Sequence, residues 1–437
     1  MRAHIAAATV VLALGLAGPA IAQTSKPTTA TAATQVAPAQ RAVIAHYADL
    51  AQAMYTDAYG AAQEMQTAIA AFLAAPSAEN QKAAQAAWKK ARDPYSKTEA
   101  FRFGNKVVDE WEGNVNSWPL DEGLIDYVDT KSYGTKSDEN PLYTANIIAN
   151  KSIRIGKKTI DTTTITPAML HKLNSAGGVE ANVASGWHAI EFLLWGQNLH
   201  VAAQGAGQRP WTDFDTKACT NGNCDRRAQF LKVATETLVA DLKEMSEAWG
   251  PKGAARATLL KKTDKAGLAV IFTGIGSLSY GELAGERMKL GLILHDPEEA
   301  HDCFSNNTHN SHYFDEVGIT DVYYGRTTRN DGTVFSGPSV ADLVRAANPK
   351  IASEIDDKMK AAEAALKVIK TSGDSGEMRY DAMLAEGNAK GNKMIQDGVD
   401  ALVAQAHAIE RGVAVLKLQI KVEGSASLDN PNAAKKK

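Results

Sequence analysis

The stretch VIAHYADLAQAMYTDAYGAAQEMQTAIAAF, residues 43–72, decides the fold class of this chain. Its apolar residues recur at spacings of three, four and seven, which is the pattern of one long amphipathic helix. The residues on this stripe are Val43, Tyr47, Leu50, Met54, Ala61, Met65, Ile69 and Phe72. The Pro76-Ser77 step that follows predicts the end of the helix.

The same period recurs along the rest of the chain, whereas the alternation typical of strands is rare. Further helices are predicted after Ser77 with a kink at Asp93-Pro94, and over 224–249, 351–370 and 394–422. Between the helices, long irregular stretches are expected over 104–165 and 292–338. We therefore expect an all-α protein of two helical-bundle halves packed side by side, with long irregular loops at a central cleft.

The first 38 residues have a different character. Residues 1–22 combine a basic start, a short apolar run and the triplet Ala20-Ile21-Ala22, which predicts a cleaved secretory signal peptide. Residues 23–38 are mostly Thr, Ala and Pro and predict a disordered linker. The expected organisation continues with an N-terminal helical half over 39–215 and a C-terminal half over 216–437. No later stretch is long and apolar enough to predict a membrane span.

Charge and cysteine content exclude several classes of protein. The 437 residues carry a net charge of −3, which argues against a nucleic-acid partner. Three cysteines exclude a disulfide-rich scaffold and a zinc site made of four cysteines. Cys219 and Cys224 flank a short Asn-Gly loop, and for an exported chain we expect a disulfide between them, two free thiols near a turn being the alternative. Cys303 is then expected to be unpaired and buried.

The segment SGWHAIEFLLWG provides the first candidate for chemistry. On a helix, His188 and Glu191 are three residues apart and face the same way, so an imidazole and a carboxylate can converge on one cation. Gly186 allows another backbone to approach or caps the helix. A hydrogen-bonded helix pair without metal is the alternative interpretation.

Two other segments contain polar residues in suggestive positions. Glu282 and Glu286 are four residues apart on a predicted helix beside Arg287, although a solvated Glu pair fits equally well. Four histidines follow within 18 residues, and they indicate either a metal site or polar turns: His295, His301, His309 and His312. Nearer the N-terminus, the candidates for the rim of a cleft, or for a packed aromatic loop, are Glu99, Arg102, Trp118 and Asp121.

Four blocks taken together resemble a known family. FRFG with SWPLD, then GWHAIEFLLWG, then SYGELAGERM, then HDCFSNNTH with GITDVYYG stand in this order over nearly the whole chain after the leader. In this respect the chain is similar to the imelysin-like family, also called peptidase family M75, and within it to the iron-regulated protein A branch. Gly186, His188 and Glu191 match the GxHxxE signature of the family. The resemblance implies a bacterial envelope protein of two helical halves, with these blocks meeting at the cleft between them.

The chain departs from the branch in its last block. Ala300, Asn306 and Ser311 stand where acidic residues are usual, which weakens a cation site in that loop. The expected metal ligands are therefore His188 and Glu191 with Glu99, Glu282 or Glu286. The ligand cleft is expected to include Arg102, Trp118, Asp121, Gly186 and Arg287.

Two functions remain open from the sequence. One is a periplasmic protein of metal acquisition, free or attached to the outer membrane, that binds a metal ion or a small ligand and works with an envelope transporter. Iron is the favoured metal and zinc the alternative. The other is an M75-type metallopeptidase in which metal held by His188 and Glu191 activates water. The motif lacks the second His of a hydrolytic zinc helix, so binding is favoured over catalysis. A scaffold that docks another envelope protein is a third possibility.

Overall fold

A computed structural model of the chain describes residues 37–199 and 205–434. The predicted signal peptide, and all but the last two residues of the predicted linker, lie outside the described residues. The described chain from Ala37 onward forms one compact unit by its contacts.

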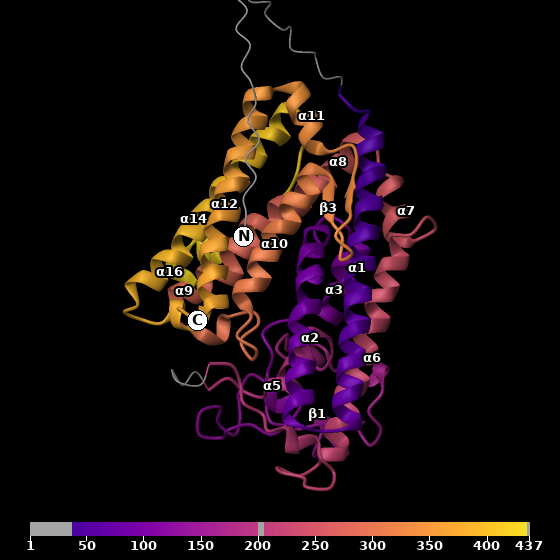
Figure 1. Cartoon of the computed structure of the whole chain (residues 1–437), viewed down its shortest axis with the longest axis vertical. Coiled ribbons are helices and arrows are strands. Elements are labelled where there is room, and N and C mark those ends of the chain that lie inside the picture. Colours follow the sequence, from indigo (N-terminus) through magenta and orange to yellow (C-terminus); the bar gives the residue numbers. More distant parts are fainter. Residues whose placement is uncertain (1–36, 200–204, 435–437) are drawn as a thin grey trace, which may run out of the picture. The chain divides into compact units, whose positions relative to one another are not determined.

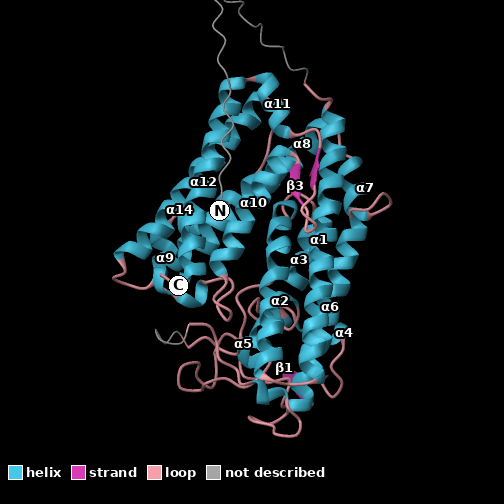
Figure 2. Ribbon diagram, in the orientation of Figure 1, coloured by secondary structure: helices cyan, strands magenta, loops and turns pink. Residues whose placement is uncertain are grey.

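The fold is helical, as the sequence predicts (Figure 2). The α-helices are α1 Gln40–Ala74, α2 Ala78–Ser96, α3 Lys106–Val115, α4 Pro167–Leu173, α5 Gly186–Trp195, α6 Cys224–Ala248, α7 Ala254–Leu260, α8 Asp264–Ser277, α9 Leu290–Leu294, α10 Thr308–Tyr324, α11 Val340–Ala347, α12 Pro349–Ser375, α13 Tyr380–Leu384, α14 Ala389–Val415, α15 Ala426–Asp429 and α16 Pro431–Ala434.

Other regular elements are short, except for one π-helix, η5, over Leu278–Lys289. The 3₁₀ turns are η1 Lys97–Phe101, η2 Glu122–Leu124, η3 Ala176–Gly178, η4 Trp211–Phe214 and η6 Pro297–Glu299. The described residues contain two antiparallel hairpins, in which Ile153 faces Ile160 and Thr327 faces Phe335. Their strands are β1 Ser152–Ile155, β2 Lys158–Asp161, β3 Arg326–Thr328 and β4 Val334–Ser336.

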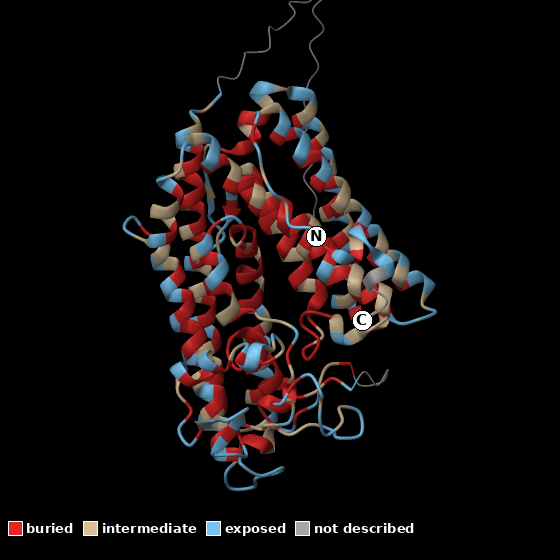
Figure 3. Cartoon of the chain, turned by 180° about the vertical axis from the view of Figure 1, so that it is seen from behind, coloured by how far each residue is buried: buried red, intermediate tan, exposed pale blue. Residues whose placement is uncertain are grey.

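The helices pack in two groups that lie side by side (Figure 1). One group is built on α1, which packs against α2 and α6, and the other on α14, which packs against α12 and η5. Helix α8 and turn η1 contact both groups. The residues on the inward faces of these helices are mostly buried (Figure 3). Helix α6 follows the predicted boundary between the two halves at 215/216, and yet it packs on α1 and α5. The position of that boundary stays a prediction.

The first two helices show how the sequence sets these elements. The predicted apolar stripe of α1 is buried along its whole length. Ser77 caps α2 by accepting a hydrogen bond from the Asn80 N–H at 3.1 Å, and Pro94 lies in the last turn, after which the chain continues as η1. The buried face of α2 includes Trp88 and Arg92, neither of them exposed at all.

Three sequence expectations need correction. The stretch 292–338, expected to be irregular, contains the 17-residue helix α10. The stretch 104–165 contains α3 and the β1–β2 hairpin, although most of the rest is irregular. The last long helix ends at Val415 rather than Val422.

Four buried charged residues hold the irregular region together, and we call them the Arg–Asp network: Asp126, Arg209, Asp213 and Arg227. Arg227 donates from Nε and Nη2 to the two oxygens of Asp126 at 2.6 and 3.0 Å. Arg209 Nη1 donates to both Asp126 and Asp213, at 2.7 and 3.2 Å. Arg227 Nη1 also donates to the carbonyls of Asp213 and Gly222. The network therefore ties the segment after η2 to α6 and to the loop before it.

The predicted disulfide is present between Cys219 and Cys224, whose Cα atoms are 5.9 Å apart. Cys303 is free and buried, as expected. Among the described residues, one helical run, Asp264–Leu294, is long and apolar enough to cross a membrane by length and composition. Since 72% of its apolar window is buried inside the folded chain, the run has the environment of a core helix.

Candidate functional site

Helix α5 places the predicted motif in the interior of the protein. Every residue of α5 is buried. Gly186 begins the helix with φ +82°, and a Cβ there would lie 2.3 Å from the Val115 carbonyl oxygen. Only glycine fits this close approach of two backbones. The predicted role of Gly186 in allowing a close backbone contact is therefore what the structure shows.

His188 and Glu191 face the same way, one turn apart, as predicted. His188 Nδ1 lies 3.1 Å from Glu191 Oε2, and neither side chain is exposed. The other carboxylate oxygen, Oε1, accepts a hydrogen bond from the Ser305 N–H at 2.8 Å. Glu191 therefore holds the imidazole in place and connects α5 to the segment before α10.

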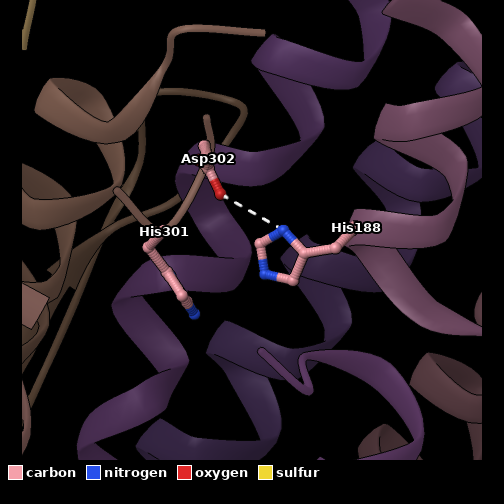
Figure 4. Close-up of side chains that lie close together, drawn as sticks. All are labelled: His188, His301 and Asp302. Atoms are coloured by element: carbon pink, nitrogen blue, oxygen red, sulfur yellow. Dashed lines mark ion pairs between the residues drawn. The ribbon is translucent and has the colours of Figure 1, made fainter. Parts of the chain in front are cut away.

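That segment brings two more ligand-type side chains to His188. His188, His301 and Asp302, which we call the histidine group, each offer a ligand atom, and these atoms lie within 4.8 Å of one another (Figure 4). The rings of His188 and His301 have centroids 4.7 Å apart, and His188 Nδ1 is 3.8 Å from Asp302 Oδ1. All three residues are buried. Two imidazoles and one carboxylate suit a transition metal such as zinc or iron.

Arg92 from α2 contacts two members of the histidine group. Its Nε donates to Asp302 Oδ1 at 3.2 Å, and its Nη2 lies 3.2 Å from the same oxygen. Nη2 is also 3.3 Å from His301 Nδ1, which must accept because a guanidinium can only donate. A cation bound through these atoms therefore competes with Arg92 for them.

Burial sets the protonation state of the group. Burial, with the charge of Arg92, lowers the pKa of His188 to about 3, and burial lowers the pKa of His301 well below its usual value. Both rings are thus neutral at pH 7, the form that binds metal. Burial alone would raise the pKa of Asp302, but Arg92, His188 and the hydrogen bond from Ser311 together outweigh it, and the net shift is downward. Burial raises the pKa of Glu191 well above the usual range, and Asp302 adds to this.

Unpartnered polar atoms gather around the same place. In the described residues, His188 Nε2 and Arg92 Nη1 are buried without a hydrogen-bond partner. On α10, both ring nitrogens of His312 are also buried without a hydrogen-bond partner. The same holds for Asp315 Oδ1. Buried polar atoms without partners are costly, so such a concentration is typical of a site that accommodates a ligand. When Glu191 is ionised and accepts the proton of Nδ1, His188 Nε2 carries a free lone pair.

Arg287 gathers a second set of predicted residues next to this group. It pairs with Glu99, with Glu282 at 2.8 Å and with Asp315 at 2.9 Å. Burial raises the pKa of Asp315 well above normal, and repulsion from Glu99 adds to this because three carboxylates share one guanidinium. Arg102 lies at the edge of this set, 3.3 Å from Glu282.

The π-helix η5 changes the register that the sequence predicts. In a π-helix, residues five apart rather than four are linked, so Glu282 pairs with Arg287. Glu286 turns elsewhere and accepts a hydrogen bond from Ser425 Oγ at 2.5 Å. Glu282 and Glu286 therefore contact different partners, and a metal ligand at Glu99, Glu282 or Glu286 beside His188 and Glu191 stays a prediction. Of the five predicted metal ligands, only His188 belongs to the histidine group.

The remaining candidates divide between the site and other places. The Trp118 ring lies 4.9 Å from that of His188, whereas Asp121 accepts a hydrogen bond from Asn140. His295 hydrogen-bonds the Leu384 carbonyl, and His309 pairs with Asp374. Asp302 stood beside His301 in the histidine cluster that the sequence offered as a metal site, although it was not among the expected ligands. Sequence reasoning missed Arg92, because nothing in the pattern of α2 distinguished it from a surface arginine.

Comparisons with known proteins agree with this arrangement. A family model described as imelysin, peptidase family M75, matches residues 51–409. Iron-regulated protein A of Synechococcus elongatus is 25% identical over 329 residues, which are 72% of this chain and 71% of that protein.

Two crystal structures share the fold. An iron-regulated protein A precursor from Parabacteroides distasonis matches with a TM-score of 0.61 and 18% identity, over 87% of this chain and 96% of that chain. An imelysin-like protein from Psychrobacter arcticum matches with a TM-score of 0.54 and 14% identity, over 86% and 95%.

Proposed function

The chain belongs to the imelysin family, peptidase family M75, and from this premise we propose that it binds a metal ion at the histidine group. Iron is the favoured ion and zinc the alternative. His188, His301 and Asp302 provide the ligand atoms, and Glu191 supports His188. The protein serves metal acquisition in the cell envelope, to which the predicted signal peptide directs it.

The observation that carries this proposal is the free Nε2 of His188. It is buried and unpartnered, on a neutral ring whose other nitrogen faces a carboxylate. Metal-binding histidines usually have such a carboxylate behind them, because it fixes the ring and raises its basicity. His301 and Asp302 lie within reach of the same ion.

Arg92 adds a condition to binding. Since the guanidinium contacts Asp302 Oδ1 and His301 Nδ1, a metal ion gains these two atoms as ligands only if Arg92 withdraws. A specific ion must therefore bind strongly enough to replace an internal ion pair. This requirement favours a transition metal over calcium or magnesium, which bind imidazole weakly.

A metallopeptidase is the second candidate. The His301 ring supplies the second imidazole that the helix motif lacks, and two His with one carboxylate is a known set for catalytic zinc. Complete burial of His188 and Asp302 argues for binding, because a peptide bond has no path to the ion in this conformation.

The test is a metal titration of the purified, metal-free protein with anaerobic Fe²⁺ and with Zn²⁺ by calorimetry. His188→Ala, His301→Ala and Asp302→Asn are each expected to lower the affinity more than about tenfold, with helicity by circular dichroism unchanged. His309→Ala is the matched control, because His309 is also buried but pairs with Asp374 outside the group. Unchanged binding by His188→Ala would refute the proposal.

Two further arms separate the alternatives. Arg92→Gln is expected to raise metal affinity, since it removes the competing cation. A loss of binding in this variant would instead indicate that Arg92 holds an anionic ligand. Peptide cleavage by the zinc-loaded protein is expected to be absent, and cleavage that His188→Ala abolishes would establish the peptidase.

A further inference from the structure

A cavity lies next to Trp118, between the irregular segments 118–143 and 197–199 and Glu298 of η6. Its volume is about 310 Å³, and three aromatic rings and three carboxylates contribute to its wall. These residues are Trp118, Tyr133, Tyr143, Asp121, Glu122 and Glu298. None of the described residues that line it is a Lys, Arg or His. The volume is at the lower end of the range for small-molecule sites.

The aromatic part of this wall is fixed in place. Tyr133 and Tyr143 stack with centroids 4.1 Å apart and an interplanar angle of 7°. The Tyr143 hydroxyl donates to the Tyr133 carbonyl at 2.8 Å, and the Tyr133 hydroxyl donates to the Tyr143 carbonyl at 3.2 Å. Gly123 N–H donates to the Tyr133 hydroxyl, and a Cβ at Gly123 would lie 2.2 Å from the Tyr143 carbonyl oxygen. The backbone next to Glu122 is therefore locked against this pair.

Glu122 is the buried acid of the cavity, with 5% of its surface exposed. Among the described residues, the Glu122 carboxylate accepts a side-chain hydrogen bond from Gln197 Nε2, at a long distance of 3.4 Å. No ion pair to Glu122 is formed in the described part of the chain. Burial, with repulsion from Glu298, raises the pKa of Glu122 to about 8. A carboxyl group held in this way is mostly protonated at pH 7, and a cation brought in from outside favours the ionised form, so it binds as Glu122 loses its proton.

We propose that this cavity binds an organic ammonium ion. The faces of Trp and Tyr rings attract cations, and a neighbouring buried carboxylate supplies the balancing charge. A metal ion fits the wall less well, because the rings offer it no ligand atom and the space is far larger than one ion. An uncharged ligand would leave Glu122 without an ionic partner.

This inference does not depend on the metal proposal. The two sites share Trp118, whose ring contacts His188 and also lines the cavity. Glu122 and Tyr143 have no contact with the histidine group, so variants can affect one site and leave the other intact. His188→Ala is expected to abolish metal binding and to retain ammonium binding, and Glu122→Gln is expected to do the reverse.

The experiment uses the chain without its leader and two probes of nearly the same shape. Choline carries a quaternary ammonium, and 3,3-dimethylbutan-1-ol replaces the charged nitrogen with carbon. By calorimetry, choline is expected to bind at least about tenfold more tightly than the alcohol, the ratio that about 1.4 kcal/mol of cation–π and charge interaction provides. Equal binding of choline and the alcohol, or no binding of either choline or ethanolamine at about 10 mM, would overturn the proposal.

Variants assign the binding to this cavity. Glu122→Gln keeps the shape and the Gln197 contact and is expected to weaken choline at least about tenfold, while Tyr143→Leu is expected to weaken it about threefold or more. Glu139→Gln is the matched control, because Glu139 is exposed on the same segment and does not line the cavity. Choline binding that Glu122→Gln leaves unchanged, or that Ca²⁺ displaces, contradicts the assignment. Ethanolamine distinguishes a primary from a methylated ammonium, and binding of either supports the proposal.

Discussion

The Arg–Asp network and the histidine group are both buried and charged, but they differ in how their polar atoms are used. In the network, Arg227 makes hydrogen bonds from all three of its nitrogens, and Asp126 accepts from two guanidinium groups. In the histidine group, His188 Nε2 and the nearby Arg92 Nη1 lack partners.

This difference separates a structural cluster from a binding site. The Arg–Asp network of opposite charges fixes loops in one arrangement, and in the described residues Arg209 Nε is its one buried side-chain atom without a partner, so it offers little to a ligand. A buried site with free lone pairs is less stable without its ligand, and proteins retain such groups where function requires them. Two substitutions test the contrast, and a third tests the cost of a buried acid that belongs to neither cluster.

The largest effect is expected from Arg227→Met in the Arg–Asp network. It leaves Asp126 with half of its partners and a buried charge, so the free energy of unfolding should fall by about 3–5 kcal/mol. Urea denaturation followed by circular dichroism measures this. A loss below about 1 kcal/mol would show that the network is not what anchors the region.

The second prediction concerns Glu316 on α10, a fully buried acid outside both clusters. Burial raises its pKa to about 8, above the unfolded value of 4.5. The contribution of Glu316 to the free energy of unfolding is therefore fully present below pH 4.5 and is lost as the pH rises toward 8. Glu316→Gln keeps an acceptor for Gln405 and should stabilise the protein by up to about 3 kcal/mol at pH 7.

The control for Glu316→Gln lies in its pH dependence. Thermal unfolding of the variant and the parent should coincide near pH 4.5 and diverge steadily up to pH 8. A constant difference across this range would mean that packing, rather than the proton, accounts for the change.

The smallest effect is expected from His312→Leu beside the histidine group. His312 is 1% exposed, both of its ring nitrogens lack partners, and its ring meets the edge of Tyr380. Removal of two unsatisfied polar atoms at similar volume should raise the stability by about 1 kcal/mol. If urea denaturation instead shows the variant to be less stable than the parent, the His312 ring has hydrogen-bond partners in solution. The contrast with the Arg–Asp network is then weaker.

The sequence predicted those elements whose apolar residues follow a helical period. Helices α1, α6 and α12 have an apolar stripe, and the pairing of His188 with Glu191 follows from their spacing on α5. Family membership also follows from ordered blocks of residues and is confirmed by the family match.

Helix α10 was missed because its buried face is polar. His309, His312, Asp315 and Glu316 are all buried there, so the segment lacks the apolar stripe on which the prediction relies. Arg92 was missed for the same reason. A buried arginine is recognisable only by its partner, and Asp302 is 210 residues away in sequence.

The number of residues in the π-helix η5 sets the direction in which Arg287 points around the helix axis. Each residue of an α-helix turns the chain by about 100°, so loss of one residue from Leu278–Lys289 would swing Arg287 away from Glu99 and Asp315. Substitutions in this segment leave the phase intact, whereas a single deletion upstream of Arg287 shifts every side chain that follows. We therefore expect the length of this segment to be more strictly constrained in evolution than its composition.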